Sequence, residues 1–234
     1  MDLKSAKVII TGGSSGLGKA MAKLLIEHGA KVLITGRNIE KLNAVAQEIG
    51  AIPFHANVAE QKDVIATFEA AKKELGGLNV LINNAGIASS WSKINELDID
   101  QMRKVYDVNV FGAAMMGKEA AKIFIEQKSG NIVNIASTAA LNGFPGGTIY
   151  SSSKFALRGM SKNWQEELRK FNIRVFNINP SAVPTAFNVE DRSERKEEAN
   201  KLTSAEIAHA VIGVLQMDER GYIPELSVHA TNPF

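Results

Sequence analysis

The segment Thr11-Gly12-Gly13-Ser14-Ser15-Gly16-Leu17-Gly18 decides the fold, because it joins a short apolar run to an amphipathic stretch. Val8-Ile9-Ile10 precedes it, and apolar side chains recur after it at helical spacing as far as Gly29. Glycines between a strand and a helix permit a tight turn and close approach to a pyrophosphate, which the helix N-terminus then binds. A plain strand-to-helix turn is the alternative, but the flanking strand and helix favour a nucleotide phosphate site.

Short β-branched runs alternate with amphipathic stretches along the rest of the chain. This alternation predicts a doubly wound, Rossmann-like parallel sheet of about seven strands with helices on both faces. A capping box at 203–206 opens the last predicted helix. The later strands are predicted at 32–34, 52–56, 80–82, 132–135, 175–178 and 226–228, of which 52–56 has the weakest pattern.

Composition and charge exclude several classes of protein. The 234 residues contain no repeat or linker, which predicts a single domain over 1–234. A net charge of +2 argues against partners such as nucleic acid or an anionic membrane, and no apolar run has the length of a membrane helix. The chain has no cysteine for disulfide or thiolate chemistry, and its four histidines lack metal-ligand spacing. Without a signal-peptide pattern, a cytoplasmic location is the simplest expectation.

A charged and polar segment, 190–201, follows Pro184-Thr185. Such a segment most often forms a solvated loop or helix face. Its place after a candidate ligand site also fits a short lid at about 186–202.

The segment after the second strand, Thr35-Gly36-Arg37-Asn38, bears on the choice of cofactor. An acidic residue here would bind the adenosine ribose hydroxyls of NAD(H), but none is present. The Arg37 guanidinium can instead pair with a 2′-phosphate. The sequence therefore favours NADP(H) over NAD(H), with an ordinary surface arginine as the alternative.

Tyr150 and Lys154 form a candidate proton-transfer pair, because side chains four residues apart share one face of a helix. A nearby ammonium favours the phenolate and is expected to lower the pKa of the tyrosine, which then acts as a general acid or base. Such pairs also occur on ordinary helices. Ser137 ends an apolar strand, where open α/β sheets bind ligands, and can hydrogen-bond a substrate oxygen.

Two asparagine motifs fit the same site. Asn109 is a polar residue within an apolar helical run, and 83–86 (Asn-Asn-Ala-Gly) follows the fourth strand as a tight, polar turn. Both have a purely structural alternative, in which the amides satisfy internal hydrogen bonds.

Together these motifs resemble the short-chain dehydrogenase/reductase family, in its compact single-domain branch. The resemblance runs from about Lys7 to Thr185 and includes T-G-x-x-x-G-x-G at 11–18, N-N-A-G at 83–86 and Y-x-x-x-K at 150–154. It implies that Tyr150 is the acid/base, that Lys154 lowers its pKa and holds the nicotinamide ribose, that Ser137 orients the carbonyl, and that Asn109 positions a water. It also implies a homotetramer or homodimer formed through helices near 100–127 and 150–170.

The cofactor-binding residues that the resemblance implies form five groups along the chain. They are Gly12, Ser14, Ser15, Gly16, Leu17 and Gly18; Arg37, Asn57 and Val58; Asn84, Ala85 and Gly86; Tyr150 and Lys154; and Pro180, Val183 and Thr185. The chain departs from the family pattern at Asn57, where an aspartate is usual, at Ser152, at Ser181 in place of a glycine, and in the tail after Val228.

The motifs predict an NADP(H)-dependent carbonyl reductase or alcohol dehydrogenase. A non-catalytic NADP(H)-binding sensor is the main alternative, although the intact 137, 150 and 154 positions argue against it. A sugar-nucleotide epimerase would need a larger C-terminal region than the one after Thr185. The residues expected to line the substrate pocket, with core packing as the alternative for each, are Trp91, Leu141, Phe144, Pro145 and Phe187.

Overall fold

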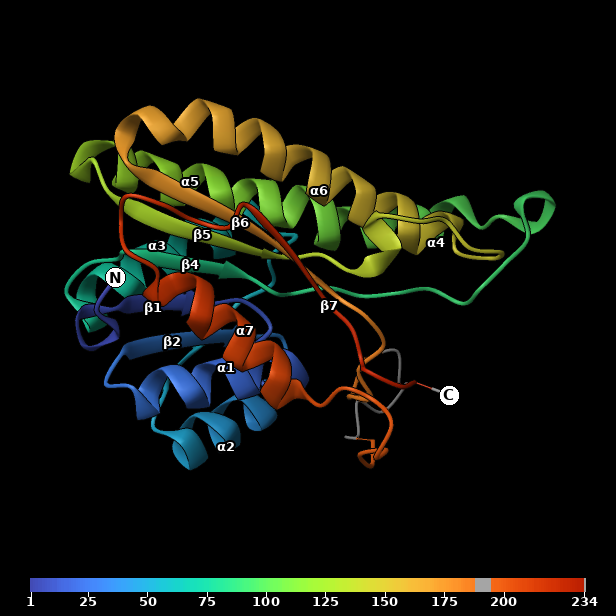
Figure 1. The fold of residues 1–234 in the computed structure, drawn as a ribbon, viewed down its shortest axis with the longest axis horizontal. Helices are drawn as coiled ribbons and strands as arrows, with labels where there is room; N and C mark the ends of the chain where they lie inside the picture. Colours follow the sequence, from blue (N-terminus) through green and yellow to red (C-terminus); the bar gives the residue numbers. More distant parts are fainter. Residues whose placement is uncertain (188–194, 234) are drawn as a thin grey trace.

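The computed structural model describes residues 1–187 and 195–233 and contains a seven-stranded parallel sheet (Figure 1). The strand order is β3-β2-β1-β4-β5-β6-β7. All seven predicted strands are confirmed, as β1 (Lys7–Ile10), β2 (Lys31–Gly36), β3 (Ile52–His55), β4 (Val80–Asn83), β5 (Gly130–Ile135), β6 (Ile173–Pro180) and β7 (Glu225–Val228). The weak pattern of β3 has a physical reason, because this edge strand pairs only with β2 and therefore tolerates Pro53.

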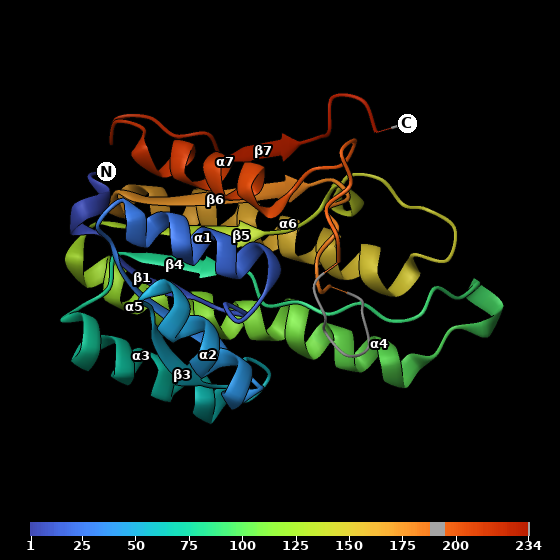
Figure 2. The same cartoon turned by 90° about the horizontal axis from the view of Figure 1, so that it is seen from below.

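Helices cover both faces of the sheet, which confirms the predicted doubly wound fold (Figures 1 and 2). One face packs against α1 (Gly16–Glu27), α2 (Ile39–Ile49) and α7 (Ser204–Gln216). The other packs against α3 (Gln61–Leu75), α5 (Ala113–Gln127) and α6 (Thr148–Leu168), while α4 (Ile99–Tyr106) lies at the end of the molecule beside α6. None of the helices in the described ranges is long and apolar enough to cross a membrane.

The strand β1 shows why the central strands read as continuous apolar runs. Val8 and Ile10 face the layer of α1, α2 and α7, whereas Ile9 faces the opposite layer, and all three are fully buried. The strand order reverses between β1 and β4, because β2 and β3 lie on one side and β5 to β7 on the other. Ligands of open α/β sheets bind at the carboxyl ends of the strands beside such a reversal.

A row of polar side chains crosses β4 to β7, and its three asparagines are buried. Asn83, Asn134, Asn177 and Glu225 are paired in register across β4, β5, β6 and β7. Asn83 Nδ2 donates to Asn134 Oδ1 (2.9 Å), and Asn134 Nδ2 donates to Ser161 Oγ of α6 (2.8 Å). Asn83 ends β4 and Asn134 lies one residue before the end of β5, so the hydrogen bond between them fixes the spacing of these two strands at the candidate site.

Candidate active site

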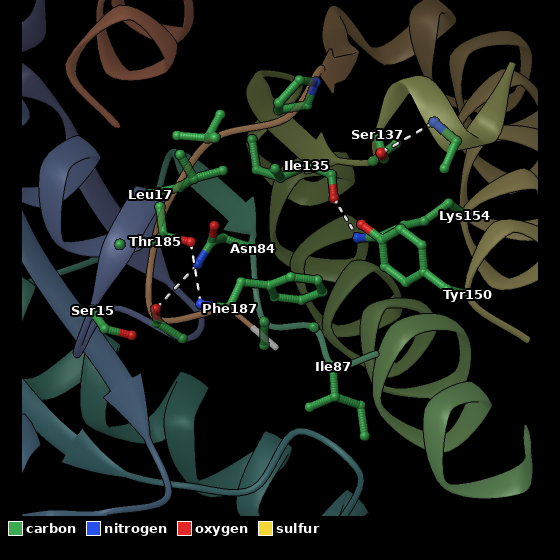
Figure 3. Close-up of a pocket in the computed structure, with 18 of the residues that line it drawn as sticks. Ser15, Leu17, Asn84, Ile87, Ile135, Ser137, Tyr150, Lys154, Thr185 and Phe187 are labelled. Atoms are coloured by element: carbon green, nitrogen blue, oxygen red, sulfur yellow. Dashed lines mark hydrogen bonds between the residues drawn. The ribbon is translucent and has the colours of Figure 1, made fainter. Parts of the chain in front are cut away.

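A cleft of about 1460 Å³ opens at the carboxyl ends of the strands, where the topology predicts a ligand (Figure 3). Its walls come from the glycine segment, the ends of β2, β4 and β5, the first turns of α6 and the loop after β6. Of the predicted cofactor residues, all except Gly18 line it, as do Ser137, Trp91, Phe144 and Phe187. The fold therefore brings residues from widely separated motifs to one cavity.

The glycine segment forms a cradle at one end of the cleft. Gly12 and Gly16 have φ values of +66° and +50°, which favour glycine. Ser15 is the N-cap of α1, but its side chain makes no capping hydrogen bond. The positive end of the α1 dipole thus lies at the cleft without a capping side chain, as a phosphate site requires.

Gly18 does not line the cleft, because it packs against the back of the cradle. A Cβ atom there would lie 2.3 Å from the Gly12 carbonyl oxygen and 2.6 Å from Asn84 Nδ2. Asn84 Nδ2 donates to the carbonyls of Thr11 (2.9 Å) and Gly12 (3.1 Å), and Thr11 Oγ1 accepts from the Ala85 N–H (2.9 Å). These bonds join the 11–18 and 83–86 motifs into one unit.

The end of β2 forms a second part of the cleft. Arg37 lines it together with Asn38 and Lys41 at the start of α2. Thr35 also lines it, and its hydroxyl is buried without a hydrogen-bond partner among the described residues. The two cationic side chains and the glycine cradle fit a dinucleotide.

Tyr150 and Lys154 lie one turn apart on α6 and point into the same part of the cleft (Figure 3). Lys154 is 4% exposed, and its Nζ donates to the Ile135 carbonyl at the end of β5 (2.9 Å). The same Nζ lies 5.8 Å from the centre of the Tyr150 ring. Ser137 follows β5, and its Oγ accepts the Ala139 N–H (3.1 Å), which fixes the hydroxyl beside the tyrosine.

Burial controls the ionisation of this pair. It raises the pKa of Tyr150 to about 12, although a hydrogen bond with Ser137 acts in the opposite direction. Burial also lowers the pKa of Lys154 to about 8. The pKa of the tyrosine is therefore raised and not lowered as predicted, because the loss of solvation outweighs the Ser137 hydrogen bond. Near neutral pH the pair is a neutral phenol beside a mostly charged amine.

Asn109 lies behind the cleft instead of lining it, in a π-helical segment over Asp107–Gly112. Its Oδ1 accepts the Ile87 N–H (2.9 Å), and its Nδ2 donates to the Ile87 carbonyl (2.9 Å) and to Ser153 Oγ (3.0 Å). A Cβ atom at Gly86 would lie 3.4 Å from Asn109 Oδ1 and 3.5 Å from Lys154 Nζ. The amide therefore holds the 84–87 loop against Lys154, and its role toward a water stays a prediction.

Two of three consecutive serines tie α6 to neighbouring segments, which the sequence did not indicate. Ser151 Oγ donates to the Ala139 carbonyl (2.7 Å) and ties the helix to the loop that carries Ser137. Ser153 Oγ accepts from Asn109 and donates to the Tyr150 carbonyl (2.7 Å). Ser152, which departs from the family pattern, donates to carbonyls of its own helix. A run of serines gives no pattern from which these separate partners could be predicted.

The predicted pocket residues need one correction. Trp91, Phe144 and Phe187 line the cleft, but Leu141 and Pro145 do not. The short helical turn at Thr138–Ala140 brings Asn142 and Gly143 to the wall instead of Leu141.

The charged segment after Thr185 contributes further lining residues that the motifs did not predict, namely Arg195, Glu198, Lys201 and, from the tail, His229. Lys201 Nζ donates to the Pro233 carbonyl (3.0 Å), so the C-terminal tail contacts this segment. Residues 188–194 of the predicted lid lie outside the described residues, and its movement stays a prediction.

Comparisons with known proteins agree with this geometry. The family model for short chain dehydrogenases matches residues 6–196. An uncharacterised oxidoreductase of Staphylococcus aureus is 34% identical over 226 residues, which are 94% of this chain and 95% of the relative. A 3-ketoacyl-(acyl-carrier-protein) reductase from Brucella melitensis, solved with NADH, is 27% identical with a TM-score of 0.86, covering 97% and 98% of the two chains. A serine dehydrogenase solved with NADP+ is 25% identical with a TM-score of 0.86, covering 94% and 93%.

Proposed function

The chain belongs to the short-chain dehydrogenase/reductase family of oxidoreductases, and from this premise we propose that it reduces a ketone to a secondary alcohol with NADPH. The observation that carries the proposal is the meeting of Tyr150, Lys154 and Ser137 in the same cleft as the glycine cradle. A bound nicotinamide cofactor supplies the hydride. The chain supplies the binding site, the orientation of the carbonyl and the proton.

Different groups of lining residues would bind different parts of the cofactor. The cradle at 12–17 would hold the pyrophosphate at the N-terminus of α1, and Arg37 would pair with the 2′-phosphate. Lys154 and Thr185 would contact the nicotinamide end, where the Thr185 hydroxyl is fixed by accepting the Phe187 N–H (3.2 Å). Asn57 also lines the cleft. Its Oδ1 accepts the Ala59 N–H (3.2 Å), so an asparagine at this position can form the hydrogen bond of the turn at 57–59.

The proton-transfer residues favour the reductive direction. Because the pKa of Tyr150 is raised to about 12, its phenol is neutral and is ready to donate a proton to a carbonyl oxygen that gains charge. The Ser137 hydroxyl would donate a hydrogen bond to the same oxygen, as an oxyanion stabiliser does. The Lys154 ammonium would then stabilise the phenolate that remains.

The pH dependence of ketone reduction tests these roles. Since the pKa of Lys154 is lowered to about 8, its ammonium loses a proton as the pH rises through that value. We expect kcat/KM to be constant at lower pH and to fall about tenfold per pH unit above about 8, because the neutral amine no longer stabilises the phenolate. Initial rates of NADPH oxidation across this range measure the profile.

The matched variant for this profile is Lys154→Arg, whose guanidinium stays charged. It should lose activity but show no fall near that pH. A wild-type rate that rises through the same pH range would contradict the assignment of Lys154.

The preference for NADPH is tested at Arg37. Arg37→Ala should raise KM for NADPH by about tenfold to a hundredfold, because a charge-assisted pair with the 2′-phosphate is lost. KM for NADH should change less than about twofold, because that cofactor lacks the phosphate. Steady-state kinetics with both cofactors measures the difference, and Arg103→Ala on α4 is a matched control. Equal effects on the two cofactors would rule out a phosphate contact.

A further inference from the structure

Four aromatic side chains form a continuous row along the cleft wall at the candidate proton donor. The ring centroids of Phe144 and Trp91 are 5.3 Å apart, and those of Trp91 and Tyr150 are 6.1 Å apart, both in edge-to-face geometry. Phe187 contacts the Tyr150 ring from another side at 5.6 Å. The Tyr150 ring thus contacts two other aromatic rings, and all four residues line the cleft.

Two glycines, Gly146 and Gly147, allow the Trp91 and Phe144 side chains to pack closely against the backbone. A Cβ atom at Gly147 would lie 2.5 Å from the Phe144 ring, so the ring rests directly on the backbone at the start of α6. Gly146 has a φ of +77°, and a Cβ atom there would lie 3.1 Å from Trp91 Cβ. Its carbonyl also accepts the Ser92 N–H (3.3 Å), which joins the two ring-bearing loops. The rings are therefore held in place before any ligand binds, which reduces the entropic cost of binding.

The rings remain partly exposed although they are fixed. Trp91 is 51% and Phe144 is 41% exposed. Within the described structure, the cleft residues from 135 to 144 and from 84 to 91 carry no charge. The charged lining residues belong to other segments and are Arg37, Lys41, Lys154, Arg195, Glu198 and Lys201. A wall of fixed, exposed aromatic surface with uncharged neighbours is the chemistry of a site for a flat, neutral, apolar group.

We propose that the substrate is a neutral ketone whose carbonyl is attached to, or part of, a flat ring that packs against Trp91 and Phe144. The proposal rests on the proposed function: the carbonyl carbon accepts the hydride, the carbonyl oxygen accepts the Tyr150 proton, and the product is the secondary alcohol. The fixed rings favour substrates with a flat ring, whereas a pocket that is only hydrophobic would favour substrates with a large apolar area.

Three methyl ketones with the same number of carbon atoms separate these cases: acetophenone, cyclohexyl methyl ketone and hexyl methyl ketone. The hexyl compound is the most flexible and at least as apolar as acetophenone, so a pocket that is only hydrophobic would prefer it. We expect kcat/KM with NADPH to be at least about tenfold higher for acetophenone than for the hexyl ketone, with the cyclohexyl ketone between them. Equal or reversed values would overturn the proposal while leaving the proposed reductase function intact.

Variants assign the preference to the rings. Trp91→Leu and Phe144→Leu keep apolar side chains but remove the rings, and each should reduce the preference for acetophenone by about threefold to tenfold. Phe155→Leu on α6 is the matched control, because Phe155 is also 41% exposed but does not line the cleft. A preference that survives in both cleft variants would show that the rings do not carry it.

If no ketone is turned over, the proposed reductase function is contradicted, but the ring preference can still be tested by measuring binding. The chain has two tryptophans, so Trp164→Phe leaves Trp91 as the only tryptophan. The concentration of ketone that gives half of the maximal fluorescence change should be at least about tenfold lower for acetophenone than for the hexyl ketone. Quenching that does not distinguish the two ketones would overturn the proposal.

Discussion

Tyr150→Phe should lower kcat for ketone reduction by about a thousandfold, since a positioned general acid contributes a factor of about 10²–10⁴. The variant loses one hydroxyl from a side chain whose ring packs against Trp91 and Phe187. The ring and its contacts remain, so the fold and the cofactor cradle should not change. Initial rates of NADPH oxidation with a saturating ketone measure the loss.

Two further measurements make this result specific to the proton donor. The dissociation constant for NADPH, from nucleotide fluorescence, should change less than about threefold, because the cradle lies in a different part of the cleft. Tyr222→Phe is the matched control: its ring packs on Phe176 at 5.6 Å, away from the cleft, and it should keep full activity. Full activity in the Tyr150 variant would remove the proposed proton transfer.

Lys154→Met should abolish most activity and at the same time stabilise the protein. The loss should be at least about a hundredfold, because the phenolate left after proton transfer has no cation beside it. The gain follows from the pKa of Lys154, which burial lowers from the ordinary 10.5 to about 8. A fold that disfavours the protonated amine is destabilised by it, and methionine removes that cost.

The sign and pH window of the stability gain follow from the two pKa values. The cost is fully present below about pH 8 and disappears as the pH rises toward 10.5, where the unfolded chain also loses the proton. We expect Lys154→Met to raise the free energy of unfolding by about 2 kcal/mol near neutral pH. This is less than the pKa shift alone implies, because the Ile135 carbonyl loses its hydrogen-bond donor.

Urea unfolding of wild type and variant at neutral and high pH measures this gain, with Lys162→Met on the exposed side of α6 as control. A variant that is less stable than wild type at neutral pH would show that Lys154 supports the fold instead of straining it.

The fold was predictable from the sequence because the central strands are buried on both faces. Runs such as Val8-Ile9-Ile10 and Val80-Leu81-Ile82 have few other stable placements than the middle of a covered parallel sheet. The row through Asn83, Asn134 and Asn177 was not predicted, because it depends on strand register between segments far apart in the sequence.

The candidate site was predictable where a motif carries its own chemistry and not where packing decides. The glycine, tyrosine and lysine positions line the cleft as the motifs suggested. Gly18, from the glycine motif, and Asn109 were predicted for the same site but lie behind the wall. Gly18 allows two backbone segments to approach each other, and Asn109 holds the 84–87 loop. The direction of the Tyr150 pKa shift depends on burial, which no local pattern of residues reveals.

The most direct test of the account is the initial rate of NADPH oxidation by the wild-type chain with a panel of neutral ketones, with Tyr150→Phe as the blank. We expect turnover with at least one ketone, a slower rate with NADH, and a rate in the variant that does not exceed background. No turnover with any ketone, although NADPH binds, would contradict it and would favour a nucleotide-binding sensor.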